Sequence, residues 1–175
     1  AIAATISNRT GNPTIIENCE VRGTNVLGTR AGNVSGILSD VDSQEVVIKD
    51  CVIADSNFTN QLSLKDVTSS YGTSTACLGV SMGDTTIENI DVSNCNINTK
   101  GFTSGGLVGC IVSKVDISNS SVKDTKIIDT GTNIDSSSRV CLRGIGGVVG
   151  QAVEFSADNL IVDNVTIDSQ VTSAG

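Results

Sequence analysis

Apolar and polar residues alternate along the chain in short runs, and each run changes phase at one residue. In residues 45–53, EVVIKDCVI, two apolar positions alternate with their neighbours, Asp50 adds one residue, and the alternation resumes on the same face. A period of two predicts β-strands, whereas an amphipathic helix needs a period near 3.6. Because Asn and Asp adopt the left-handed backbone region more readily than most residues, the added residue predicts a bend between two short strands.

The same nine-residue pattern occurs five times, with an Asn or Asp at the bend and a small residue or Cys after it. The copies are residues 13–21, 45–53, 89–97, 114–122 and 159–167. They align the bends at Asn18, Asp50, Asn94, Asn119 and Asn164. One strand–bend–strand unit cannot enclose a core alone, so stacked copies are expected to build it from ladders of inward apolar residues.

A glycine-rich phrase recurs between these copies and predicts a third strand in each repeat. It reads GNVSG at 32–36, TACLG at 75–79, GGLVG at 105–109 and GGVVG at 146–150. Small residues at its ends allow tight turns, and its middle pair supplies one inward apolar residue.

Residues 105–122, GGLVGCIVSKVDISNSSV, and GGVVG followed by IVDNVTI resemble the GLUG repeat. In that family a Gly-Gly-Leu-Val-Gly phrase precedes an apolar-any-Asn-Cys segment, in tandem in bacterial surface proteins that include non-catalytic parts of some IgA-specific metalloproteases. The resemblance covers most of the chain, with its strongest matches in residues 75–122 and 146–167. It implies a right-handed parallel β-helix at a cell surface, and it transfers no catalytic residues.

The repeats and the resemblance together predict an all-β fold, a right-handed parallel β-helix (β-solenoid) of about five rungs with three short strands per rung. Residues 1–175 are expected to form a single domain, as a segment of a longer repeat protein.

Composition narrows this picture. Aromatic residues make up only 2% of the chain, so aliphatic and small side chains must fill the core. The net charge of -8 opposes binding to nucleic acid or to an anionic membrane, since both require a cationic surface. The chain contains no run of 18 apolar residues, so membrane insertion is not predicted.

The six cysteines leave two interpretations open. Cys19, Cys51 and Cys95 share the position after the aligned bend, where they could form a ladder of buried thiols or contain a disulfide. The other cysteines lie in less regular sequence, and a bridge among them is the favoured interpretation, although its connectivity cannot be deduced. They are Cys77, Cys110 and Cys141.

Two long insertions, residues 54–74 and 123–145, are expected on one face of the solenoid, where repeat proteins often bind partners. Aromatic and basic residues gather in them although the chain is acidic. The predicted binding residues are Phe58, Lys65, Tyr71, Lys126, Arg139 and Arg143. The alternative is that apolar residues of these insertions only cover the flank of the solenoid.

The chain contains no His, which excludes Ser-His-Asp and Cys-His catalysis and the usual zinc sites. Asp91 and Asp116 are predicted to stack on neighbouring rungs, where a close pair could serve a retaining glycosidase or hold a cation. Two solvated carboxylates are the favoured interpretation. We therefore predict no catalytic residue, metal or cofactor.

The sequence favours a non-enzymatic extracellular or cell-surface module that acts as an adhesin-like binding or spacer domain. Its expected partner is a host or neighbouring surface protein or a glycan. One alternative is a filament subunit that stacks head to tail, because residues 1–6 look like a third strand that the last rung lacks. A carbohydrate-active enzyme, a glycan lyase or hydrolase, is the second alternative.

Overall fold

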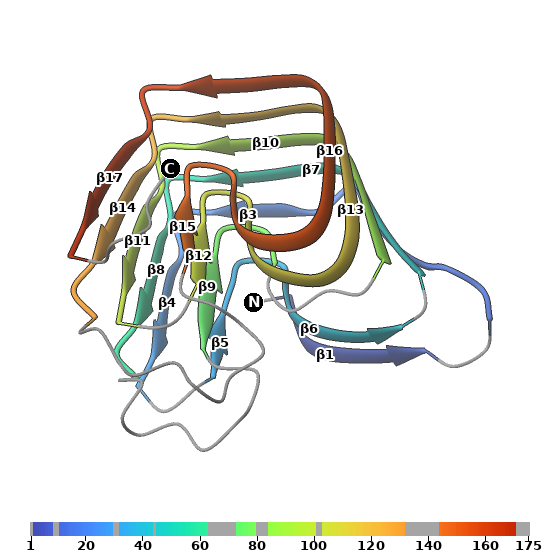
Figure 1. Cartoon of the computed structure of the whole chain (residues 1–175), viewed down its shortest axis with the longest axis horizontal. Helices are drawn as coiled ribbons and strands as arrows, with labels where there is room; N and C mark the ends of the chain where they lie inside the picture. Colours follow the sequence, from blue (N-terminus) through green and yellow to red (C-terminus); the bar gives the residue numbers. More distant parts are fainter. Residues whose placement is uncertain are drawn as a thin grey trace.

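The computed structural model describes residues 2–8, 11–29, 32–43, 45–62, 73–79, 84–100, 103–131 and 144–170. Within these ranges the chain forms strands and no helix, and every strand pair is parallel. Figure 1 shows the strands of successive repeats stacked into sheets. Among the described residues, three sheets contain four to six strands, and β1 and β6 form a separate pair. No described segment is a helix long and apolar enough to cross a membrane.

The largest sheet, called the long sheet below, runs in the order β16-β13-β10-β7-β2, and β3 also pairs with β7. Its strands are β2 (Thr14–Glu17), β3 (Glu20–Arg22), β7 (Glu45–Ala54), β10 (Asp84–Ser93), β13 (Val108–Lys123) and β16 (Val149–Asp163). β7 and β13 continue through the predicted bends at Asp50 and Asn119, whereas β10 and β16 end just before those predicted at Asn94 and Asn164.

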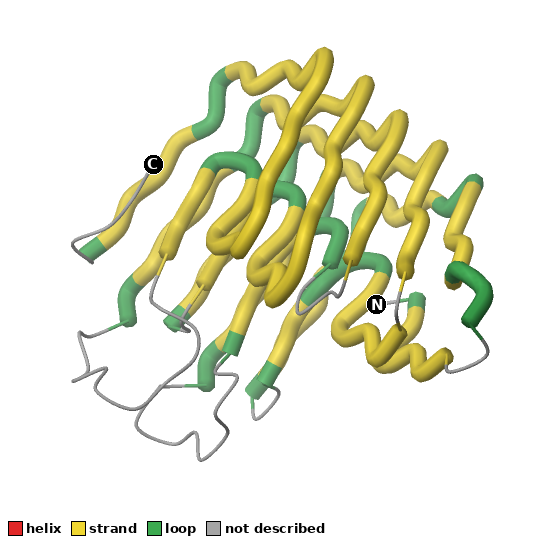
Figure 2. The backbone as a smooth tube through the Cα atoms, turned by 45° about the vertical axis from the view of Figure 1, so that its right-hand side comes forward, coloured by secondary structure: helices red, strands yellow, loops and turns green. Residues whose placement is uncertain are grey.

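Two smaller sheets complete each repeat. The side sheet contains β4 (Asn25–Gly28), β8 (Asn57–Asn60), β11 (Asn96–Thr99), β14 (Lys126–Asp129) and β17 (Thr166–Ser169). Its strands lie in the order β17-β14-β11-β8-β4. The glycine-rich sheet contains β5 (Asn33–Val34), β9 (Ser74–Ala76), β12 (Thr103–Gly105) and β15 (Gly144–Gly146). Its strands lie in the order β15-β12-β9-β5. The tube in Figure 2 shows corresponding strands of successive repeats side by side. Parallel strands in stacked sheets confirm the predicted all-β class and are compatible with a β-solenoid.

Each repeat contains two left-handed bends, whereas the sequence pattern predicted one. The bend residues have φ angles between 48° and 57°. The first bends are Asn18, Asp50, Asn89, Asn119 and Asn159, and the second bends are Gly23, Asp55, Asn94, Asp124 and Asn164. Only Gly, Asn and Asp occupy these positions, since they tolerate this backbone region best.

The predicted alignment of the third and fifth copies was therefore wrong. The register of β7 and β10 pairs Ile90 with Cys51, so Asn89, and not Asn94, lies beside Asp50. The error arose because both bends of a repeat have an apolar residue two positions before and a small or apolar residue after them. One corrected inward ladder is Ile16, Ile48, Ile87, Ile117 and Ala157.

Hydrogen bonding explains why a small polar residue or Cys follows so many bends. The Ser120 hydroxyl donates to the Ser118 carbonyl at 2.7 Å, two residues before it. The Cys51 thiol makes the same contact with the Lys49 carbonyl at 3.1 Å. The Lys49 carbonyl also accepts from the Asn18 backbone N–H at 3.2 Å, so the side chain after the bend supplies a second donor to a carbonyl that already pairs with the neighbouring repeat. Cys95 belongs to the second bend, so only Cys19 and Cys51 share one position.

The first strand, β1 (Ala3–Asn8), pairs with β6 (Leu38–Ser43) and places Ala3 opposite Leu38. β6 follows the glycine-rich phrase and leads toward β7. The Ile2 backbone N–H donates to the Gly36 carbonyl at 3.1 Å, and Leu38 in turn bridges to Gly79. Residues 2–6 thus lie beside the end of the glycine-rich phrase and the segment after it, so the expectation that residues 1–6 form a third strand holds only in part.

Candidate binding groove

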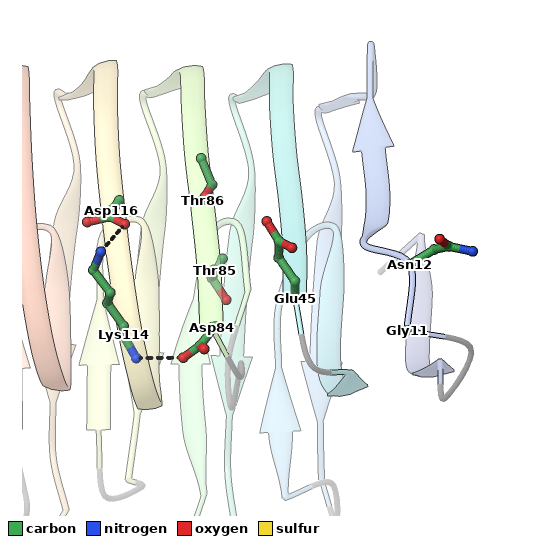
Figure 3. Close-up of a pocket in the computed structure, with 8 residues that line it drawn as sticks. All are labelled: Gly11, Asn12, Glu45, Asp84, Thr85, Thr86, Lys114 and Asp116. Carbon is green, nitrogen blue, oxygen red and sulfur yellow. Dashed lines mark hydrogen bonds and ion pairs between the residues drawn. The ribbon is translucent and has the colours of Figure 1, made fainter.

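A shallow polar groove of about 310 Å³ lies over the long sheet, beside the first residues of β7 and β10. Its lining residues, drawn in Figure 3, are Gly11, Asn12, Glu45, Asp84, Thr85, Thr86, Lys114 and Asp116. Glu45 lies opposite Asp84, and Thr86 lies opposite Asp116. Since neighbouring strands are about 4.8 Å apart, the register brings these side chains from separate repeats onto one surface.

Lys114 links two of the three carboxylates of the groove, those of Asp84 and Asp116. Its ammonium nitrogen lies 2.8 Å from Oδ2 of Asp116, and its backbone N–H donates to Oδ1 of Asp84 at 3.3 Å (Figure 3). Hydroxyl groups complete both sets of contacts, because Ser156 donates to Asp116 and Ser113 donates to Asp84. The groove therefore holds charged groups in defined positions although it is open to solvent.

These contacts move the ionisation of the three groups away from neutral pH. Hydrogen bonds from Ser113 and then from the Lys114 backbone lower the pKa of Asp84. Hydrogen bonds from Lys114 and then from Ser156 lower the pKa of Asp116. The bond with Asp116, followed by its charge, raises the pKa of Lys114. At neutral pH these three groups of the groove are thus two carboxylates and one ammonium group.

The predicted stacking of Asp91 and Asp116 does not occur. Asp91 pairs with Ser121, whose hydroxyl donates to the Asp91 carboxylate at 2.6 Å, while Asp116 pairs with Thr86. The shifted alignment of the third copy produced the error. Among the described residues, no three or more Cys, Asp or Glu side chains gather in a way that could hold a metal ion.

Phe58 is not available to a partner, so its assignment as a binding residue was wrong. Its side chain is 0% exposed and lies on β8, between Val26 of β4 and Ile97 of β11. The sequence predicted that an insertion begins at residue 54, but residues 57–60 form strand β8 of the side sheet. Phe58 fills the core there, as expected for a large apolar side chain on the inward face.

Lys126 is exposed at the start of β14. It lines a second polar hollow, of about 430 Å³, with Asn94, Asp124, Thr125, Asn164 and Thr166. The other predicted binding residues, Lys65, Tyr71, Arg139 and Arg143, lie outside the described residues.

The last repeat exposes part of the apolar core. A hollow of about 530 Å³ lies against β16 and the segment before it, and its apolar side chains include Phe155 and Leu160. Phe155 and Val162 are 49% and 50% exposed, although their ladder partners Val115 and Val122 are 0% exposed. The difference arises because no described strand lies on the outer side of β16.

Comparisons with protein-family models, with curated proteins and with solved structures found no match to this chain. The resemblance to the GLUG repeat therefore stays a prediction.

Proposed function

We propose that this chain is an extracellular module that binds a neutral glycan in the polar groove without cleaving it. We further propose that the stacked sheets form a right-handed β-helix of about five rungs, of the GLUG type. The recurrent glycine-rich strand and the two bends per repeat support this form of the fold.

The main support for glycan binding is the set of contacts that joins Asp84, Lys114 and Asp116. The side chains come from two neighbouring strands and hold one another by hydrogen bonds and an ion pair. Preorganised donors and acceptors bind a hydroxyl-rich ligand with less loss of side-chain entropy than mobile ones would. Glu45, Asn12 and Thr86 add further polar groups along the same groove.

The chemistry of the groove favours a neutral glycan over other partners. The described residues of its lining include none of the aromatic residues or Arg that dominate protein–protein hot spots. The chain carries a net charge of -8, which disfavours acidic polysaccharides and nucleic acids.

The protonation states favour binding over catalysis. Acid–base catalysis works best with groups whose pKa lies near the working pH, such as a carboxylic acid with a raised pKa. In the groove, the pKa of Asp84 and of Asp116 is lowered and the pKa of Lys114 is raised. These three groups therefore keep their charges across the neutral range.

An array of neutral oligosaccharides, probed with wild type and Lys114→Met, tests this function. The variant should retain the fold, since an exposed ion pair contributes little stability, and should lose about tenfold in affinity for the retained sugar. Lys49→Gln is the matched control, because Lys49 also forms an ion pair on the long sheet, with Glu17 at 3.0 Å, but does not line the groove.

Equal binding by wild type and Lys114→Met, or no retained sugar, would contradict the proposal. The pH dependence gives a second check. Because the pKa of Asp116 is lowered in the folded chain, its ion pair persists above about pH 4 and is lost as the pH falls through that lowered pKa. Binding should therefore remain constant from pH 8 to about pH 5 and weaken only below about pH 4.

End-to-end assembly is a second candidate function, favoured by the exposed apolar side chains of β16. Continuing the register of the long sheet into a second copy would, however, place Glu17 of that copy beside Asp158. These like charges oppose stacking at low salt. Light scattering that rises with protein concentration and falls for Val162→Lys would favour this candidate over a monomeric binding module.

A further inference from the structure

Two buried cysteines from different sheets meet in the core. Cys77 directly follows β9, and Cys95 directly follows the second bend at Asn94. Their side chains are 0% and 1% exposed and share a hydrogen bond in which the Cys77 thiol donates to Cys95. The contact joins the glycine-rich sheet to the side sheet across the narrow interior.

Comparison of the repeats shows that this pair is unusual within the chain. The residues that correspond to Cys77 in the other described repeats are Gly36, Gly106 and Gly147. The residues that correspond to Cys95 are Thr24, Ser56, Thr125 and Val165. Among the described repeats, only Cys77 has a side chain at its position, where the others have Gly. Only Cys95 has a thiol at the other position, and the two cysteines belong to the same repeat.

The backbone geometry at these two positions suits a covalent bridge. At the equivalent place in the last repeat, a Cβ added to Gly147 would lie 3.4 Å from Cγ1 of Val165. A disulfide requires Cβ atoms about 3.5–4.5 Å apart, and this Cβ–Cγ1 contact shows that side chains at the two positions lie next to each other, as a bridge requires. Near the cysteines, the Thr75 and Thr99 hydroxyls hydrogen-bond at 3.3 Å and hold β9 against β11.

We propose that Cys77 and Cys95 form a structural disulfide when the chain folds in an oxidising compartment. A thiolate of the pair attacks a small-molecule disulfide such as oxidised glutathione, which forms a mixed disulfide and releases one glutathione thiolate. The second cysteine thiolate then displaces the second glutathione. The two cysteine thiols lose two protons and two electrons in total. Oxidised glutathione gains the two protons and the two electrons and becomes two molecules of reduced glutathione.

Burial decides when this reaction takes place. Both sulfur atoms are shielded in the folded chain, so the exchange occurs during folding, before the third repeat closes. Before that closure neither thiol is buried, so either thiolate can attack first.

Cys19 and Cys51 are expected to remain thiols because of the spacing between neighbouring strands. They occupy equivalent positions in neighbouring repeats, where the Cys19 backbone N–H donates to the Cys51 sulfur at 3.4 Å. Stacked residues of neighbouring parallel strands keep their Cβ atoms about 4.8 Å apart, which is wider than a relaxed disulfide allows.

Mass spectrometry after oxidative refolding tests the bridge. The chain is refolded in a glutathione redox buffer, its free thiols are alkylated, and it is digested with trypsin. Residues 66–100 form one tryptic peptide with both cysteines, because no Lys or Arg lies between Lys65 and Lys100. The expected peptide is two hydrogens lighter than the dithiol and unalkylated, and it separates into two linked fragments after cleavage at Glu88. A doubly alkylated peptide, or linkage of Cys77 to another cysteine, would overturn the proposal.

The double variant Cys77→Gly with Cys95→Ser is the matched control, since the chain itself uses Gly106 and Ser56 at these positions. Oxidative refolding should raise the Tm of wild type by on the order of 5–10 °C over the reduced protein. The Tm of the variant should be the same under both conditions. Equal Tm values for oxidised and reduced wild type would contradict a stabilising bridge. Neither readout depends on the groove or its ligand.

Discussion

Replacing Ile48 with Asp is expected to lower the free energy of unfolding by about 4 kcal/mol or more. The Ile48 side chain is 0% exposed and stacks between Ile16 and Ile87 in the corrected inward ladder. A carboxylate there would be buried without a partner, so the variant must either take up a proton or unfold. Urea denaturation followed by far-ultraviolet circular dichroism measures the change.

The neighbouring substitution Lys49→Gln is the control for this prediction. Lys49 faces outward, lies between Glu17 and Glu88, and pairs with Glu17 at 3.0 Å. Loss of this exposed ion pair should change the free energy of unfolding by less than about 1 kcal/mol. If Ile48→Asp and Lys49→Gln had equal effects, the assignment of inward and outward faces would be wrong.

Phe58→Ala is expected to lower the free energy of unfolding by about 3–5 kcal/mol. Phe58 is the largest of the fully buried side chains, and its ring lies against the backbone at Gly36. Removing the ring would leave a cavity that the aliphatic neighbours on β4 and β11 cannot fill without moving the strands. Thermal and urea unfolding of the variant give the measurement.

Lys126→Ala is the control for Phe58→Ala, because the sequence pattern assigned both residues to a partner surface. Lys126 is exposed, so its truncation should alter stability by no more than about 0.5 kcal/mol. A Phe58→Ala protein as stable as wild type would show that the ring is a surface contact and that β8 does not contribute to the core.

The fold class could be predicted because the binary pattern is strong at most positions. Val46 and Ile48 alternate with outward residues as they do in the structure, and Asp50 adopts the expected left-handed conformation with φ 54°. One bend of each repeat was missed because the two bends lie five residues apart and have similar neighbours, as Asn89 and Asn94 show. Local pattern alone could not choose between them, since only pairing with the next repeat fixes the register.

The groove was missed for the same reason. The alignment of Asn94 with Asp50 moved Asp84 out of the outward column that contains Glu45 and Lys114. A signal was present, because the spacing from Asp50 to Asp55 matches the spacing from Asn89 to Asn94 and would have restored the register. Phe58 misled the prediction because aromatic residues are rare in this chain, and their rarity was taken as a sign of binding instead of packing.

A titration followed by amide NMR spectra shows whether the polar groove on the long sheet binds a glycan without cleaving it. The titrant is the neutral oligosaccharide that the array retains. We expect shift changes concentrated at residues 84–86 and 114–116, their loss in Lys114→Met, and an oligosaccharide of unchanged mass afterwards. Shift changes centred on Lys126 and Asn164, or cleavage of the sugar, would overturn glycan binding in this groove.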